Sequence, residues 1–219
     1  IPVDKYDWEI AYLDANDDEV TVVEGENQPI TEDGLTTYLW MGSLSQPNIQ
    51  IVDAPFIVSS NRPAGVADIW FASNLTHHSM VDIYLTELDA VLTDAAPVAT
   101  VTSGSFTSRF SVDAGPNQQI RITVAGSNEL LFDSGSLEIL NKTEDLYALV
   151  DDFGPDGAKH VNVIRTIGSI GSTILDESQP ASVRIGNYSE QSPVTAMLGA
   201  AVYPNINRSE ERRVGKECR

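Results

Sequence analysis

The sequence predicts an all-β protein, and three observations support that fold class. Apolar and polar residues alternate in many short segments, which is the pattern of a strand with one face toward a core and one toward water. Clusters of Gly, Pro, Asn and Asp separate these segments and predict turns. The segments recur about every 8–12 residues, a spacing typical of an antiparallel β-sandwich or barrel. Only residues 85–95 and 195–201 also fit a short helix.

The clearest alternation lies in the middle of the chain. In the segment FTSRFSV (106–112) both phenylalanines should face the core. In the segment IRITV (120–124) Ile122 should face the core and Arg121 the solvent. The segment 81–85 alternates in the same way. The other predicted strands, rich in β-branched and aromatic residues, are 20–23, 36–41, 49–52, 67–71, 98–102, 130–132, 137–140, 146–150, 161–165 and 183–185.

Length, charge and hydropathy exclude several classes of protein. The chain has 219 residues, 42% of them hydrophobic, which is enough for a substantial core. It carries 32 Asp+Glu against 13 Lys+Arg, a net charge of −19. This charge argues against nucleic-acid partners and anionic membrane surfaces, both of which require a basic face. No apolar run approaches the roughly 20 residues needed to span a bilayer, so we expect no membrane-spanning segment.

The last twelve residues (208–219) read RSEERRVGKECR and back-translate codon for codon onto a short-read sequencing adapter. We therefore expect a non-native tail and exclude it from fold reasoning. Without it the chain has 8 basic and 29 acidic residues, a net charge of −21. Cys218, the single cysteine, lies in this tail, so we expect no disulfide, zinc-thiolate site or cysteine nucleophile in the rest. Because the chain begins at Ile1, we expect a fragment of a longer protein.

A weak internal repeat with a period near 110 residues suggests the domain organisation. The segment 67–72 resembles 181–186, and 35–40 resembles 144–149. A period of this length corresponds to a whole domain, not to a solenoid repeat. A Pro-marked linker precedes each new unit. The predicted pieces are 1–60, the C-terminal part of a first unit; 62–178, a complete domain; 179–207, the start of a further unit; and 208–219, the tail.

The complete unit resembles the bacterial and archaeal family catalogued as domain of unknown function 4397. The residues that carry the resemblance are ADIWFAS (67–73), VDIY (81–84), VDAG (112–115) and YALV (147–150). The resemblance implies tandem immunoglobulin-like β-sandwich domains on exported or surface-anchored proteins, with no known catalytic residues. The expected fold is therefore all-β, mainly antiparallel, with one complete and two partial sandwiches.

Two acidic segments are candidates for calcium. Asp14, Asn16 and Asp18 place oxygens at positions 1, 3 and 5 of a calcium loop. Glu19 stands where an EF-hand needs Gly, and Gly25 where it needs Glu, which excludes an EF-hand. A looser calcium loop stays open, and an exposed acidic hairpin turn is the simpler interpretation.

The second acidic segment contains Asp151, Asp152 and Asp156, and the same two interpretations apply to it. His77 and His78 lie in a predicted loop without a His partner at metal-binding spacing, so we interpret them as a solvated loop. No other cofactor is expected.

No residue pattern indicates catalysis. The chain has no G-x-S-x-G motif, and the segment GSIGS (168–172) lacks the lysine of a phosphate-binding loop. We therefore expect no catalytic residues and no enzyme activity. Trp8, Trp40 and Trp70 could form a sugar-stacking platform, although Trp40 and Trp70 lie in predicted strands and suit a core or sheet edge better.

The sequence thus predicts a non-catalytic module of a multi-domain exported or cell-surface bacterial protein. It would act as a spacer, adhesion or binding domain toward an unknown protein or glycan ligand. We expect it in the periplasm, on the cell surface or in the extracellular space. The acidic charge fits an extracellular protein from a saline habitat and equally a cytosolic protein from a halophile. The alternatives are an accessory, carbohydrate-binding part of a secreted enzyme, and a periplasmic binder of a small ligand or calcium.

Overall fold

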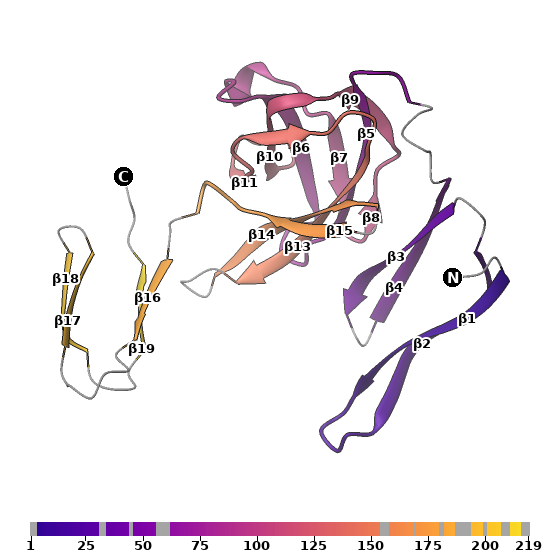
Figure 1. Ribbon diagram of the computed structural model, residues 1–219, viewed down its shortest axis with the longest axis horizontal. Helices are drawn as coiled ribbons and strands as arrows, with labels where there is room; N and C mark the ends of the chain where they lie inside the picture. Colours follow the sequence, from indigo (N-terminus) through magenta and orange to yellow (C-terminus); the bar gives the residue numbers. More distant parts are fainter. Residues whose placement is uncertain are drawn as a thin grey trace.

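A computed structural model describes residues 4–30, 34–43, 46–55, 62–153, 158–168, 170–179, 182–186, 194–198, 201–206 and 211–215. These residues form strands almost throughout, which confirms the all-β prediction (Figure 1). The two segments that also fitted a helix are not α-helical where they are described. The first contains the end of a strand and one short 3₁₀ turn, η2 (Leu92–Asp94). Within the described part of the chain, no helix is long and apolar enough to cross a membrane.

Two sheets pack face to face in the central unit (Figure 1). The first, here called the β13 sheet, has the strand order β15-β14-β13-β5-β8, with β9 also pairing β5. Its strands are β5 (Val66–Asn74), β8 (Ser105–Phe106), β9 (Phe110–Asp113), β13 (Glu144–Phe153), β14 (Lys159–Ile167) and β15 (Ile170–Ile174). The second, the β10 sheet, comprises β6 (Met80–Glu87), β7 (Ala99–Thr102), β10 (Gly115–Val124), β11 (Leu130–Asp133) and β12 (Leu137–Ile139).

The core lies between these sheets and follows the alternation of the sequence. The β13 sheet contributes Phe71 and Tyr147, and the β10 sheet contributes Ile83, Ile122 and Phe132, all fully buried. Removing these large apolar side chains from water is the main favourable contribution to folding. The predicted core face of 120–124 and 81–85 is confirmed.

Strand pairing is mainly antiparallel, as predicted, with one parallel pair among the described strands. β5 and β13 run in the same direction from Asp68 opposite Glu144 to Asn74 opposite Val150. Parallel neighbours need a long connection, and here that connection passes through the whole β10 sheet. β5 is thereby buried in the interior of the β13 sheet.

The prediction that Arg121 faces solvent is wrong, because the outer face of the β10 sheet is also covered. Arg121 is only 8% exposed, and its Nη2 donates to Thr86 Oγ1 at 2.9 Å. Thr123, on the same face, is fully buried. Asp82 is 7% exposed and accepts hydrogen bonds from the Thr100 hydroxyl and the Gly126 N–H. Polar side chains on this face pack against one another instead of against water.

The prediction that Phe106 and Phe110 share the core face is also wrong. Phe110 packs against the core, but Phe106 is 41% exposed and contacts Trp70 on the outer face of the β13 sheet. Ala72 lies opposite Phe106 and Ile69 opposite Phe110, so four residue steps on one strand oppose three on the other. The extra residue forms a β-bulge. Side chains on the two sides of the bulge therefore point to opposite faces of the sheet from those that simple alternation predicts.

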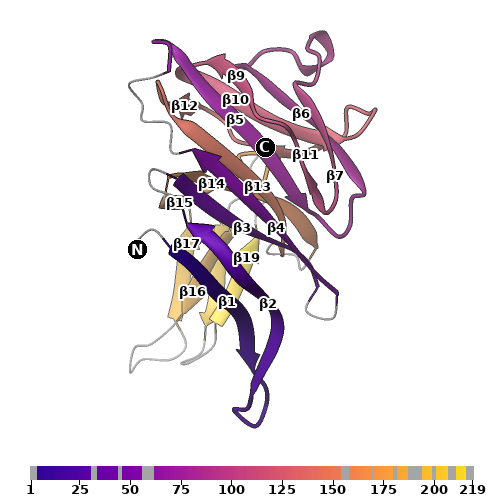
Figure 2. The same cartoon turned by 90° about the vertical axis from the view of Figure 1, so that its right-hand side faces the viewer.

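Two hairpins precede the central unit (Figure 2). They are β1 (Asp4–Leu13) with β2 (Glu19–Ile30), and β3 (Gly34–Ser43) with β4 (Gln46–Pro55). Trp8 contacts Tyr38 edge-on at 4.9 Å between ring centroids, which joins the two hairpins. Leu39 packs against Trp70, Ala72 and Leu146 on the outer face of the β13 sheet. This segment is therefore in direct contact with the central unit.

The C-terminal strands form two further pairs. β16 (Ser182–Gly186) pairs with β19 (Glu211–Gly215), and β17 (Val194–Leu198) pairs with β18 (Ala201–Ile206). β19 lies inside the segment that resembles a sequencing adapter. The domain boundaries inferred from the repeat stay a prediction. The predicted strands omit β1, although Trp8 and Ile10 alternate with acidic residues there, and β15, whose Gly and Ser residues have low strand propensity. They also omit β17, β18 and β19, of which β17 and the start of β18 fall in the second segment that also fitted a helix.

Candidate functional site

The first acidic segment forms the turn of the β1–β2 hairpin. Asp14 Oδ1 accepts the backbone N–H groups of Asn16 at 2.8 Å and of Asp18 at 3.0 Å. These two hydrogen bonds lower the pKa of Asp14 below its ordinary value. The carboxylate that was a candidate calcium ligand is therefore engaged in stabilising the turn.

The carboxylates of the second acidic segment do not converge on one point. Both oxygens of Asp151 contact protein groups, and Asp152 Oδ1 accepts the N–H of Phe153 at 2.7 Å. Asp156 lies outside the described residues. Among the residues that the structure describes, no three His, Cys, Asp or Glu side chains gather closely enough to hold a metal ion.

Asp151 is instead the centre of a polar cluster at one end of the central unit. His77 Nδ1 lies 2.5 Å from Asp151 Oδ1, and the Thr76 N–H donates to Oδ2 at 3.0 Å. The Thr76 hydroxyl also donates to Oδ2. Lys159 Nζ lies 2.6 Å from Thr76 Oγ1 and 3.4 Å from Asp151 Oδ2. The loop between β5 and β6 is thereby fastened to the β13–β14 hairpin.

This cluster changes the interpretation of the histidine pair. The segment is a loop, as predicted, but the His77 side chain is only 22% exposed and its ring lies 4.2 Å from that of His78. Burial lowers the pKa of His78, and the neighbouring His77 lowers it further. Burial would raise the pKa of Asp151, but the Thr76 groups and His77 outweigh it, so that pKa is lowered.

The cluster lacks the geometry of a hydroxyl–histidine–carboxylate triad. Such a triad needs a hydroxyl donating to the histidine and a carboxylate orienting that histidine. Here the Thr76 hydroxyl donates to Asp151 itself and accepts from Lys159. The arrangement neutralises a carboxylate and holds a loop, and it does not activate a nucleophile.

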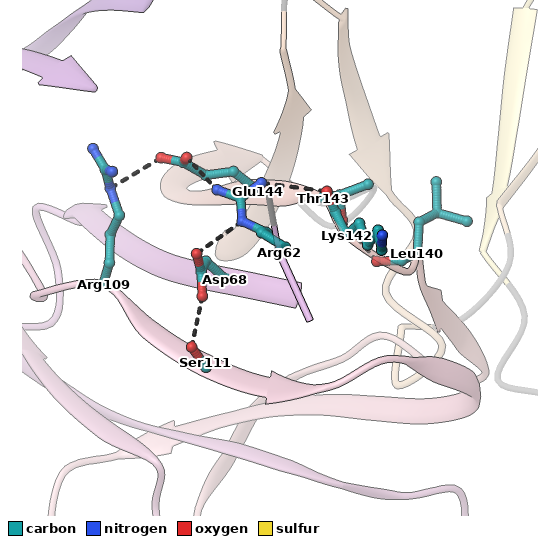
Figure 3. A network of polar contacts seen from close by, with 8 residues as sticks. All are labelled: Arg62, Asp68, Arg109, Ser111, Leu140, Lys142, Thr143 and Glu144. Atoms are coloured by element: carbon teal, nitrogen blue, oxygen red, sulfur yellow. Dashed lines mark hydrogen bonds and ion pairs between the residues drawn. The ribbon is translucent and has the colours of Figure 1, made fainter. Parts of the chain in front are cut away.

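A second polar network fixes the start of the central unit at Arg62 (Figure 3). Arg62 is 7% exposed, and its Nε and Nη2 bond Asp68 Oδ2 at 2.9 Å and Glu144 Oε2 at 2.7 Å. Arg109 Nε bonds the other oxygen of Glu144 at 2.9 Å, and the Ser111 hydroxyl donates to Asp68 at 2.7 Å. Two arginines and two carboxylates thus join the start of the unit at Arg62 to β5, β9 and β13.

The electrostatics of this network fit a structural role. Burial raises the pKa of Asp68, but the Ser111 hydroxyl and Arg62 outweigh that effect and lower it overall. The Arg109 guanidinium also lies 5.8 Å from the centre of the Trp70 ring, a cation–π contact. Sequence reasoning treated Arg62 as part of a Pro-marked linker. Its position beside Pro63 in a chain with few basic residues is the signal that could have identified it.

Trp70 does not offer a free face for sugar stacking, because it is 4% exposed and packed, in agreement with the structural interpretation. Trp8 contacts Tyr38 and lies over Gly25, and Trp40 is half-buried in β3. No protein-family model matches this chain, and no curated protein matches it significantly.

Proposed function

We propose that this chain is part of a tandem array of immunoglobulin-like β-sandwich units in a multi-domain exported or cell-surface bacterial protein, related to the family described as domain of unknown function 4397. In this proposal the units act as spacers and binding modules without catalysis. The observation that carries it is the contact between the preceding hairpin and the outer face of the β13 sheet, where Leu39 packs against Trp70 and Leu146. A packed contact of this kind favours a defined orientation between consecutive units, which a spacer requires.

Two further observations support the proposal. Arg62 bonds to Asp68 of β5 and Glu144 of β13, which fixes the start of the central unit next to this contact. The net charge of −19 favours solubility and separation between copies of an exposed array.

The first test is the gene on both sides of this sequence. We expect a signal peptide upstream and further units of about 110 residues, the length of a typical sandwich domain. A neighbouring catalytic domain would favour the accessory part of a secreted enzyme instead. A start codon near Ile1 without an export signal would overturn the proposed location.

The second test measures the orientation of the first hairpin relative to the central unit. In a Cys218→Ser variant, spin labels are attached at Val20→Cys in β2 and Ile170→Cys in β15, which are both exposed positions. Electron–electron resonance should give a narrow distance distribution that broadens in Arg62→Ala. An equally broad distribution with Arg62 present would contradict the spacer role.

A further inference from the structure

β15 (Ile170–Ile174) is the edge strand of the β13 sheet, and its outer side has no neighbour among the described strands. In an antiparallel pair, alternate residues bond the neighbouring strand, and the backbone N–H and C=O groups of the others point to the free side. Ile170 is 72% exposed, and Gly171, Ser172 and Thr173 are exposed as well. β15 therefore presents an open row of backbone donors and acceptors, which is a template for a further strand.

Two other edges of the central unit carry features that hinder such pairing. β8 has only two residues, and the bulge separates it from β9. β11 has a register shift against β10, and the segment after β15 bonds both the N–H and the carbonyl of Asp133 at its end. β15 is in regular register with β14 and contains no charged residue and no proline. It lacks the features with which proteins normally block an edge.

The surface beside this edge is uncharged in a strongly acidic chain. Residues 161–175, which span most of β14 and all of β15, include one charged side chain, Arg165, and it is paired with the buried Asp145. The whole chain has a net charge of −19, so two copies repel each other over most of their surface. The β14–β15 edge is a place where two copies approach without opposing like charges.

The sequence of β15, IGSTI, suits pairing with a second copy of itself. In an antiparallel pair centred on Ser172, Ile170 of each copy lies opposite Ile174 of the other, and Gly171 lies opposite Thr173. Ile170 and Ile174 share one face of the sheet, and Ile174 packs against the core, so the exposed Ile170 gains an apolar neighbour. Each contact occurs twice, as a two-fold symmetric interface requires.

We propose that β15 pairs antiparallel with β15 of a second copy of this chain, which joins the two β13 sheets into one continuous sheet. A pair of five-residue strands buries less than the roughly 1,200 Å² of a stable interface, so the association of single units is weak. Units linked in one array would reinforce it. The proposal specifies the partner of the binding module proposed above and rests on that role.

The test is sedimentation equilibrium of the full chain at concentrations up to about 1 mM. A reducing buffer keeps Cys218 from linking the copies. We expect the average mass to rise with concentration, and more strongly in about 1 M NaCl than in about 0.1 M, because salt screens the repulsion between copies. In nuclear magnetic resonance spectra, the backbone signals of residues 170–174 should shift with concentration.

Position 172 tests the register, because the proposed symmetry places Ser172 opposite itself. Ser172→Lys and Ser172→Glu each set like charges opposite one another and should each weaken self-association by about fivefold. An equimolar mixture of the two variants should associate about as strongly as the parent, because unlike charges then meet. Thr102→Lys, which places the same charge at an exposed position of the edge strand β7, is the matched control and should associate as the parent does.

Association that strengthens with salt, shifts the signals of residues 170–174 and returns in the mixture supports the proposal. A parent chain that stays monomeric up to about 1 mM overturns it, as do signal shifts confined to other strands. Since mixing cannot rescue an unfolded variant, recovery in the mixture separates a lost contact from a lost fold. If the parent stays monomeric while the gene shows a signal peptide and more units, the pairing fails and the module proposal stands.

Discussion

At the scale of single residues, Asp145 is an acidic side chain buried completely inside the central unit. Arg165 donates to its Oδ2 through Nε at 2.9 Å and Nη2 at 2.5 Å. The Tyr147 hydroxyl donates to the same oxygen at 3.3 Å, and burial raises the pKa of that phenol. Arg165 Nη1 donates to the Glu138 carbonyl at 3.0 Å, which closes the pair off from water.

Removing one member of this pair should destabilise the central unit strongly. We expect Arg165→Met to lower the free energy of unfolding by about 3 kcal/mol or more, because a buried carboxylate loses its counter-ion. The double variant Arg165→Met with Asp145→Leu should recover most of the loss, since it leaves no unpaired charge. Urea unfolding of the three proteins checks this. A double variant less stable than Arg165→Met would contradict it.

The lowered pKa of Asp151 predicts that the central unit loses stability in acid. Its pKa in the folded chain is lowered from the ordinary 3.8, so its ionised form stabilises the fold above that pH. This contribution is lost as the pH falls through the lowered value. Unfolding free energies measured between about pH 6 and pH 2 should fall more steeply below about pH 4 in the parent than in Asp151→Asn. Parallel curves would refute a role for the Asp151 cluster in stability.

At the scale of elements, the bulge between β8 and β9 decides which aromatic side chains enter the core. The Thr107 hydroxyl accepts the N–H of Phe71 at 3.0 Å, and the Thr107 N–H donates to the Phe71 carbonyl at 2.8 Å. A side-chain oxygen thereby replaces the strand carbonyl that the bulge removes from the pairing.

Thr107→Val should therefore destabilise the unit by about 1–3 kcal/mol, because it leaves a buried N–H unsatisfied at nearly constant volume. Thr107→Ser keeps the hydroxyl and should cost less. Thermal and urea unfolding give the comparison, with Ser108→Ala as the neighbouring control. Equal stability of the Val and Ser variants would show that the hydroxyl does not maintain the bulge.

The same elements show how far sequence reasoning could reach. Alternation identified Ile83 and Ile122 as core residues because burial on one face is a local pattern. It could not identify the burial of Arg121, which depends on what covers the second face. It could not detect the bulge, because one inserted residue leaves the composition of a strand unchanged.

Long-range polar contacts could not be predicted from the sequence for a different reason. His77 and Thr76 are far from Asp151 along the chain, and the parallel β5–β13 pairing brings them to the same end of the unit. The same holds for Arg62 and Glu144. The acidic segments were visible in the sequence, but their partners were not.

At the scale of the whole molecule, the C-terminal tail offers a direct test of what belongs to the protein. β19 lies in the adapter-like segment and pairs only with β16 among the described strands. Deleting residues 208–219 should leave the main melting transition unchanged in calorimetry, because the core lies between the sheets formed by β5 to β15. A loss of several degrees would mean that the tail contributes to the fold.

The direction of the strands has a mechanical consequence. β5, β13 and β15 all run the same way in the β13 sheet, because β5 pairs parallel with β13, and β14 is antiparallel to both β13 and β15. A pull on the two ends of the central unit draws the start of β5 and the end of β15 in opposite directions along the strands. Such a load acts in shear, so the backbone hydrogen bonds between neighbouring strands resist it together instead of opening one by one. Under tension, the central unit should therefore yield at high force.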